Sequence, residues 1–362
     1  MTNQAGRVIG ILSAYSVMIL AIGLMNHVIV VPPLLQVAKR DAWISVLVVM
    51  LPYLAWVGLL HRIMKRTGQE PLLLWLNRHW GRIASGTVRA FFIIYLFLIA
   101  VMTLKDTTMW THTSYLPRTP ELVVSASLVL LSVFAVHFGI RTIAIASGIL
   151  LPFVIVFGDF VMSANLPQKN YALLTPMLEH GLSPALRGTV YVGGGLAELF
   201  ILLLFQHRLK SDVRPWSLYL LASFLVLLVL GPVTGAISEF GPYEAAELRY
   251  PAYEEWRLVK IGKYIRHVDF LSIYQWLSGA FVRIALSMFL LLELLIVNHK
   301  KYRAAMAGLL GLALVILVEL PISDMQYTAF LKRYYLPGSL WGVTGMLLML
   351  SLLTSMTTRK QR

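Results

Sequence analysis

The stretch Tyr191–Phe205 reads Y-V-G-G-G-L-A-E-L-F-I-L-L-L-F, and it decides how the rest of the chain is interpreted. It is apolar enough for a membrane-spanning helix, yet it contains three glycines, Gly193 to Gly195, and one acid, Glu198. Each glycine costs about 1 kcal/mol against alanine in a helix interior, and an acid near the bilayer centre costs roughly 2.5–3.5 kcal/mol. We therefore predict an interrupted helix that lines a binding site. The alternative is a plain helix whose glycines admit a close neighbour and whose acid is hydrogen-bonded within the bundle.

The composition is that of an integral membrane protein. The chain has 362 residues, 58% hydrophobic and 13% charged, and its mean hydropathy is +0.74. A helix needs ~20 apolar residues to cross a bilayer, and the hydrophobic runs divide into about ten such segments. No room remains for a soluble catalytic domain. Because cysteine is absent, disulfides, thiolate catalysis and cysteine metal sites are excluded.

Ten segments are predicted to span the membrane, and two further pieces to lie on its surface. An amphipathic piece at 71–82 precedes the third span, and residues 240–269 are predicted to form extracytoplasmic surface helices. Asp41 is predicted to cap the helix of the second span. The spans are predicted at about 8–35, 42–60, 83–104, 120–137, 142–162, 191–205, 216–237, 270–298, 304–320 and 336–356.

The first span is a second candidate for an interrupted helix. It contains Gly23, Asn26, His27 and the pair Pro32-Pro33. Interruptions in spans one and six of ten indicate two repeats of five spans, about 8–162 and 187–356. An odd-numbered repeat must be inverted, because its second copy starts on the opposite side of the membrane. We therefore predict an all-α, inverted five-plus-five transporter-like fold in a single transmembrane domain, residues 1–362.

The distribution of basic residues predicts how the chain is oriented in the membrane. The net charge is +14 and the pI is about 10.0, but lysine and arginine concentrate in the short loops on the side of the N-terminus. The positive-inside rule therefore places both termini in the cytoplasm. Nucleic-acid binding is not expected, because the aromatic residues lie in apolar spans rather than on a soluble stacking platform.

Three polar side chains are predicted near the membrane centre. A rise of ~1.5 Å per residue puts Glu198, Arg283 and Tyr95 near the middle of a ~30 Å core. Buried charges need partners, so Glu198 and Arg283 are predicted to pair or to flank one ligand. A structural ion pair away from any ligand is the alternative. Asn26 and His27 are further ligand candidates, although a lone histidine is more often a core residue.

No cofactor, metal site or enzyme activity is expected. The nine histidines are scattered and show no metal-ligand spacing, phosphate-binding loop or nucleophile elbow. No nucleophile, base and oxyanion constellation can be assembled from the chain.

Four parts of the sequence resemble one family. P-P-L-L-Q-V-A-K-R-D-A-W-I-S at 32–45 is similar to the proline, spacer and D-x-W turn after the first helix of spore germination receptor B subunits. Arg118-Thr119-Pro120 resembles the family's R-T-P at the start of helix four, and Leu196-Ala197-Glu198 resembles its small-residue-x-Glu pattern. The segment from Tyr250 through Arg266, Asp269 and Trp276 resembles its outer-loop helix. The likeness is collinear over most of the chain.

The resemblance implies an endospore germination permease-like subunit, distantly similar to amino acid, polyamine and organocation transporters. Such subunits have ten helices, sit in the spore inner membrane beside an A subunit and a lipoprotein C subunit, and bind the nutrient germinant. Relatives often carry glycine or another small residue where this chain has Met25, Asn26 and His27, which implies a different ligand or a more polar pocket. The ligand-binding candidates are Gly23, Met25, Asn26, His27, Tyr95, Gly193, Gly194, Gly195, Glu198, Val282 and Arg283.

Two functions fit these features. One is a receptor subunit that senses a small nutrient, an amino acid by resemblance, and signals to partner subunits. The other is a proton- or ion-coupled amino acid transporter. A ligand-gated ion or water channel, with Glu198 as the gate, is a third possibility. Opposed helix N-termini favour a carboxylate and Glu198 favours an ammonium, so together they suit a zwitterion.

Overall fold

The computed structural model describes residues 8–260, 267–295 and 300–360, and throughout these it is helical apart from short turns and loops. The predicted cytoplasmic ends, 1–7 and 361–362, and Arg266 of the family resemblance lie outside the described residues. Within the described part, eight helical stretches are long and apolar enough to cross a membrane. The first, Ile11–Arg66, holds two of the predicted spans, and Tyr302–Val318 is a shorter apolar helix. Together these helices agree with the ten predicted membrane spans.

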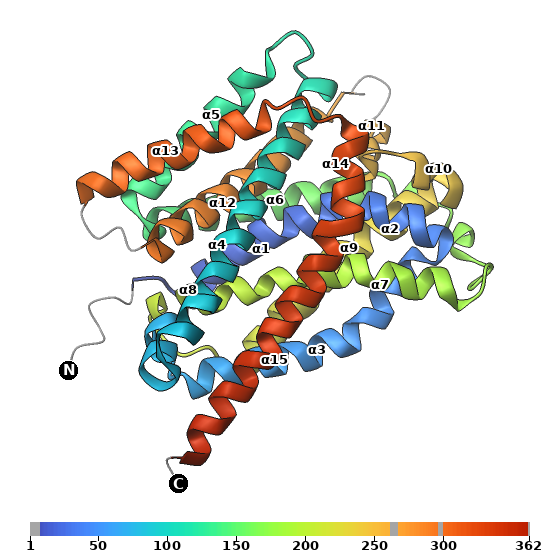
Figure 1. Ribbon diagram of the computed structural model, residues 1–362. Coiled ribbons are helices and arrows are strands. Elements are labelled where there is room, and N and C mark those ends of the chain that lie inside the picture. Colours follow the sequence, from blue (N-terminus) through green and yellow to red (C-terminus); the bar gives the residue numbers. More distant parts are fainter. Residues whose placement is uncertain (1–7, 261–266, 296–299, 361–362) are drawn as a thin grey trace.

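Helix α1 runs through the centre of the bundle, where it contacts α6, α9 and α12 (Figure 1). Helices α5 and α13 pack together along one edge, and α15 crosses α3 and α4. The longer helices are α1 (Ile11–Leu24), α3 (Ala42–Arg66), α4 (Leu72–Ser114), α5 (Glu121–Phe138), α6 (Ile140–Ala164), α7 (Leu182–Leu196), α9 (Pro215–Phe240), α12 (Phe270–Leu294), α13 (Lys300–Val318) and α15 (Leu336–Lys360). The shorter ones are α2 (Val31–Ala38), α8 (Leu202–Phe205), α10 (Pro242–Glu247), α11 (Pro251–Leu258) and α14 (Asp324–Phe330).

The first span is interrupted where the sequence predicts. Helix α1 ends at Leu24, a π-helical turn follows at Met25–Ile29, and α2 restarts at Val31 with prolines at its first positions. Proline lacks the N–H that a continuous helix would use and fixes φ near a helical value, so it suits a helix start. The π-turn widens the helix at the depth where α7 approaches it.

The sixth span is interrupted one turn later than predicted. The three glycines stay within regular helix α7, and the change to a 3-10 turn comes at Ala197–Ile201, which carries Glu198. The glycines instead allow close packing, as in the alternative interpretation. A Cβ at Gly193 would lie 2.9 Å from the Leu340 side chain, and one at Gly194 would meet the backbone oxygen of Leu336.

Two other expectations need correction. Asp41 occupies the position before α3 but makes no side-chain cap, because its Oδ1 instead accepts a hydrogen bond of 2.8 Å from the Leu178 N–H. The piece at 71–82 does precede the third span as predicted: α4 consists of two helices, 72–80 and 82–114, which meet at a kink at Gly81, where φ is +80°. The tenth span begins earlier than predicted, with α14 and a π-turn at Leu331–Tyr335.

A buried polar cluster fastens α11 to the bundle. The Glu255 carboxylate packs against Gly235 of α9, where a Cβ would lie 2.7 Å from it. Asn165 Nδ2 donates to the Glu255 carbonyl at 2.7 Å, and Lys169 pairs with Glu239 at 3.4 Å. Burial raises the pKa of Glu255 well above its usual value, and the nearby Glu239 raises it further, while Lys169 opposes the shift. Helices α10 and α11 lie within the predicted 240–269 piece.

We expect Gly194→Ala to lower the free energy of unfolding by about 1–3 kcal/mol, because the new Cβ meets backbone that cannot move aside. Gly345→Ala is the matched control: nothing lies within 4 Å of a Cβ there, so its stability should be unchanged. Thermal unfolding in detergent measures both. Equal stability of the two variants would show that Gly194 is not a packing contact.

The Glu255 cluster predicts a pH-dependent stability. A carboxyl whose pKa is raised in the fold contributes stability that is complete below its unfolded value of 4.5 and is lost as pH rises through the folded pKa. Glu255→Gln should therefore remove part of the fall in melting temperature that sets in as the pH rises above 4.5. Glu254→Gln, at a partly exposed neighbouring position, should leave the profile unchanged. Parallel profiles for wild type and Glu255→Gln would contradict the assignment.

Candidate functional site

The centre of the bundle holds a buried ion pair. Glu198 lies in the 3-10 turn of span six and is 1% exposed, and Arg283 lies in α12 and is 2% exposed. Arg283 Nη2 donates to Glu198 Oε1 at 2.6 Å, and Nη1 donates to Oε2. Two parallel contacts of this kind match the planar guanidinium to the carboxylate. The predicted pairing of the two residues is confirmed.

All five N–H groups of Arg283 have acceptors. Besides the two contacts with Glu198, Nε donates to Thr103 Oγ1 at 2.7 Å and Nη1 to the Ala21 carbonyl at 3.0 Å. Nη2 also donates to the Tyr335 hydroxyl at 3.3 Å, and that hydroxyl donates to Glu198 Oε1 at 3.1 Å. A guanidinium has five N–H donors, so this one is saturated by the protein itself.

This central cluster, Ala21, Thr103, Glu198, Arg283 and Tyr335, joins five different spans: one, three, six, eight and ten. Removing two charges from water is costly, and a buried pair compensates only when its remaining hydrogen-bond positions are filled. Here they are filled from the elements around it. The arrangement holds the interrupted spans together.

A second polar chain lies beside the cluster and includes Tyr95. The Tyr95 hydroxyl and Ser339 Oγ are 2.6 Å apart, and Ser339 Oγ donates to the Gly194 carbonyl at 2.8 Å. The Tyr53 hydroxyl donates to the Leu196 carbonyl at 3.2 Å. These hydroxyls satisfy carbonyls at the end of α7, where the α-helical pattern gives way to a 3-10 turn.

Asn26 is the polar side chain at this level that lacks partners. It lies in the π-turn of span one and is 0% exposed. Neither its Nδ2 nor its Oδ1 has a hydrogen-bond partner within the described residues. The amide faces Gly195, where a Cβ would collide with Asn26 Oδ1. A buried amide left unpaired costs about 1–3 kcal/mol per group, so its retention here points to a ligand or water.

The other predicted residues have apolar or separate surroundings. His27 Nδ1 lies 3.1 Å from the Leu228 carbonyl of α9, and a Cβ at Gly23 would lie 3.3 Å from the Leu228 side chain. Both therefore lie against α9. Met25 and Val282 are buried, at 1% and 0% exposed. A ligand role for these four residues stays a prediction.

Sequence reasoning missed Thr103, Tyr335, Ser339 and Tyr53. Thr103, Ser339 and Tyr53 are hydroxyls within otherwise ordinary apolar spans, and no spacing pattern marks them. Tyr335 falls just outside the predicted tenth span, which was expected to begin at residue 336. Its place before Pro337 is the one local signal, because proline favours a helix start or irregularity nearby.

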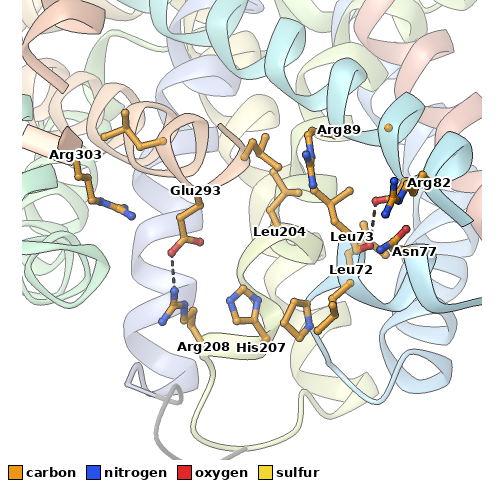
Figure 2. A pocket seen from close by; sticks show the side chains of 16 residues that line it. Leu72, Leu73, Asn77, Arg82, Arg89, Leu204, His207, Arg208, Glu293 and Arg303 are labelled. Carbon is orange, nitrogen blue, oxygen red and sulfur yellow. Dashed lines mark hydrogen bonds and ion pairs between the residues drawn. The ribbon is translucent and has the colours of Figure 1, made fainter. Parts of the chain in front are cut away.

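Two cavities open at opposite ends of α4, and neither is lined by Glu198 or Asn26. One of about 640 Å³ surrounds the start of α4, between residues 71 and 89 (Figure 2). The other, of about 700 Å³, lies at the far end of α4. There Arg249 pairs with both Asp106 and Asp324, at 2.8 Å each, and stacks 4.4 Å from the Tyr250 ring. The residues of the central cluster line neither cavity.

We expect Glu198→Gln and Arg283→Gln each to lower the free energy of unfolding by about 3–5 kcal/mol, since each leaves one buried charge without its counterion. The double variant should lose much less than the sum of the two. Arg257→Gln, in an exposed pair with Glu254, should change stability by at most about 1 kcal/mol. Unfolding in detergent would measure this cycle, and simple additivity would show that the pair is not coupled.

Comparisons with known proteins agree with these features. The sequence profile of the spore permease family, described as spore germination protein, matches residues 11–324. Spore germination protein XB of Bacillus anthracis is 41% identical over 327 residues, covering 90% of this chain and 92% of that protein. Spore germination protein KB of Bacillus subtilis (strain 168) is 24% identical over 287 residues, covering 75% of this chain and 74% of that protein.

A solved structure shares the fold. The crystal structure of MhsT in complex with L-phenylalanine superimposes with a TM-score of 0.61 at 12% identity, covering 94% of this chain and 87% of that chain. At this identity the likeness concerns the fold alone, and it confirms the predicted transporter-like arrangement with spans one and six interrupted. Since the family profile spans most of the chain, this multi-pass membrane protein belongs to the spore permease family of spore germination proteins.

Proposed function

We propose that the protein is the nutrient-sensing B subunit of a spore germination receptor. In this proposal it sits in the spore inner membrane with both termini in the cytoplasm, and it signals to an A subunit and a lipoprotein C subunit. Family membership supports the biological setting. The single observation that carries the site is the buried, unpartnered amide of Asn26 opposite Gly195, at the interruption of span one.

The ligand we propose is a small molecule with a donor and an acceptor close together, such as an α-amino acid. Arg283 has no N–H left to bind a carboxylate. Helix α2 offers few backbone donors either, because Pro32 and Pro33 occupy its first positions. The Asn26 amide supplies what these lack, since Nδ2 can donate to a carboxylate while Oδ1 accepts from an ammonium.

We propose that the Tyr335 hydroxyl couples ligand binding to a movement of α15. Its contacts with Glu198 and Arg283, at 3.1 and 3.3 Å, are the longest in the central cluster and the most easily displaced. Tyr335 lies in the π-turn that leads into α15. A ligand that draws Glu198 or Arg283 away from this hydroxyl would release the start of α15, a long element at the surface of the bundle. Partner subunits would respond to this movement of α15.

An amino acid transporter is the second candidate, and the shared fold with MhsT favours it. Transport requires that the site open to each side in turn. In this protein, the contacts of Arg249 with its two carboxylate partners and those of the central cluster would have to break for the site to open. Counterflow of a labelled amino acid in proteoliposomes containing this chain alone would identify a transporter, whereas binding without flux would identify a sensor.

The decisive measurement is ligand-dependent thermal stabilisation of the purified chain by a panel of amino acids, sugars and nucleosides. We expect at least one amino acid to raise the melting temperature by the amount that its concentration and its dissociation constant together predict. Asn26→Ala should lower the affinity for that ligand by about fivefold to a hundredfold, the equivalent of roughly 1–3 kcal/mol. The ligand-free melting temperature of this variant should hold or rise, because an unpaired buried amide is removed.

Ser16→Ala is the matched control, since this hydroxyl of span one donates to the Leu12 carbonyl of its own helix, and it should keep the wild-type affinity. In the same assay Tyr335→Phe should bind more tightly, because the ligand no longer displaces a hydroxyl. Tyr327→Phe, whose hydroxyl bonds the Met102 carbonyl, should not. If no compound stabilises the chain, or if Asn26→Ala binds as wild type does, the proposed site is wrong.

A further inference from the structure

The cavity at the start of α4 is strongly basic. Four arginines line it, Arg82, Arg89, Arg208 and Arg303, against one carboxylate, Glu293, which leaves an excess of three positive charges. Figure 2 shows Arg303 on one side of the hollow and Arg82 and Arg89 on the other, with His207 and the Arg208–Glu293 pair between them. The volume of about 640 Å³ is that of a small-molecule site.

The described residues leave some N–H groups of these arginines without an acceptor. Arg89 Nε, Arg208 Nε and Arg303 Nη2 are buried and have no hydrogen-bond partner within the described residues. Arg208 has one carboxylate partner, Glu293, at 2.6 Å. The Arg303 guanidinium is positioned over the Phe289 ring at 4.8 Å. Buried N–H groups without acceptors are costly, and in Arg283 of the same protein every one is paired. The cavity therefore lacks an acceptor.

The missing acceptor has the chemistry of a phosphate. Guanidinium groups approaching from several directions match the tetrahedrally arranged oxygens of a phosphate, which can accept several hydrogen bonds at once. Exposed apolar side chains occur next to the cavity: Leu74, which lines it, is 53% exposed, Ile83, beside Arg82, is 87% exposed, and Tyr302, beside Arg303, is 66% exposed. These apolar side chains are neighbours of the arginines in sequence. They would contact the acyl chains of a lipid whose headgroup lies among the arginines.

We propose that this cavity binds a phosphate-bearing anion, and that the anion is the headgroup of an anionic phospholipid in the leaflet at this end of the bundle. The positive-inside rule assigns this end to the cytoplasm, where basic pockets between membrane helices take anionic headgroups. The cavity joins the start of α4 to the ends of spans six and eight and to α13. A bound headgroup would therefore hold these four elements together.

The test uses the full chain in neutral detergent micelles that contain either phosphatidylglycerol or phosphatidylcholine, with inorganic phosphate as a separate arm. We expect phosphatidylglycerol to bind and stabilise the protein, and phosphatidylcholine to do so much less. Arg89→Gln and Arg303→Gln should each weaken binding about fivefold, the equivalent of one basic contact. Arg78→Gln is the control: it lies on the same helix and is exposed, but it does not line the cavity.

A second variant guards against loss of folding. Gly86 lines the cavity, and nothing lies within 4 Å of a Cβ there, so Gly86→Phe should fill the space while keeping every arginine. It should abolish the preference for phosphatidylglycerol without lowering the ligand-free melting temperature. Binding of inorganic phosphate alone would assign the site to a soluble phosphate compound instead of a lipid. Equal binding of both lipids without a phosphate effect, or an equal loss in Arg78→Gln, would overturn the proposal.

Discussion

The buried contact between Glu198 and Arg283 is the interaction on which the centre of this protein depends. Neither charge is tolerable alone at that depth. The pair is acceptable because Ala21, Thr103 and Tyr335 fill the remaining hydrogen-bond positions. Those three groups come from spans one, three and ten. Both interrupted spans therefore contribute to this one ion pair: the 3-10 turn of span six carries the carboxylate, and α1 of span one supplies the Ala21 carbonyl, one turn before the π-turn begins.

The ion pair also constrains how a ligand can act. A saturated guanidinium does not invite an anion, so the available polar group at the centre is the Asn26 amide. A small molecule held there lies between two spans that the cluster fixes to each other. Binding can then be coupled to movement by competition for one weaker contact, such as that of the Tyr335 hydroxyl. This mechanism suits a sensor and a transporter alike, and what differs is whether both ends open.

The two ends of the bundle are built differently. At the far end of α4, Arg249 has two carboxylate partners, Asp106 and Asp324. At the start of α4, four arginines share one carboxylate, and several of their N–H groups have no partner within the described residues. At the far end the protein therefore supplies the counterions itself. At the start of α4 the basic groups outnumber the acidic ones, and the site is suited to an anion from outside the protein.

The sequence by itself determined the ten spans, the irregular first span, the family and the partnership of Glu198 with Arg283. Hydropathy is a local property, and a charge at membrane depth must find an opposite charge, of which few exist. Only the tertiary structure decided that Gly193 and Gly194 serve packing, that the turn falls at Ala197–Ile201, and that Asn26 is left unpaired. Those outcomes depend on which side chain of a distant span lies opposite, and no local pattern carries that information.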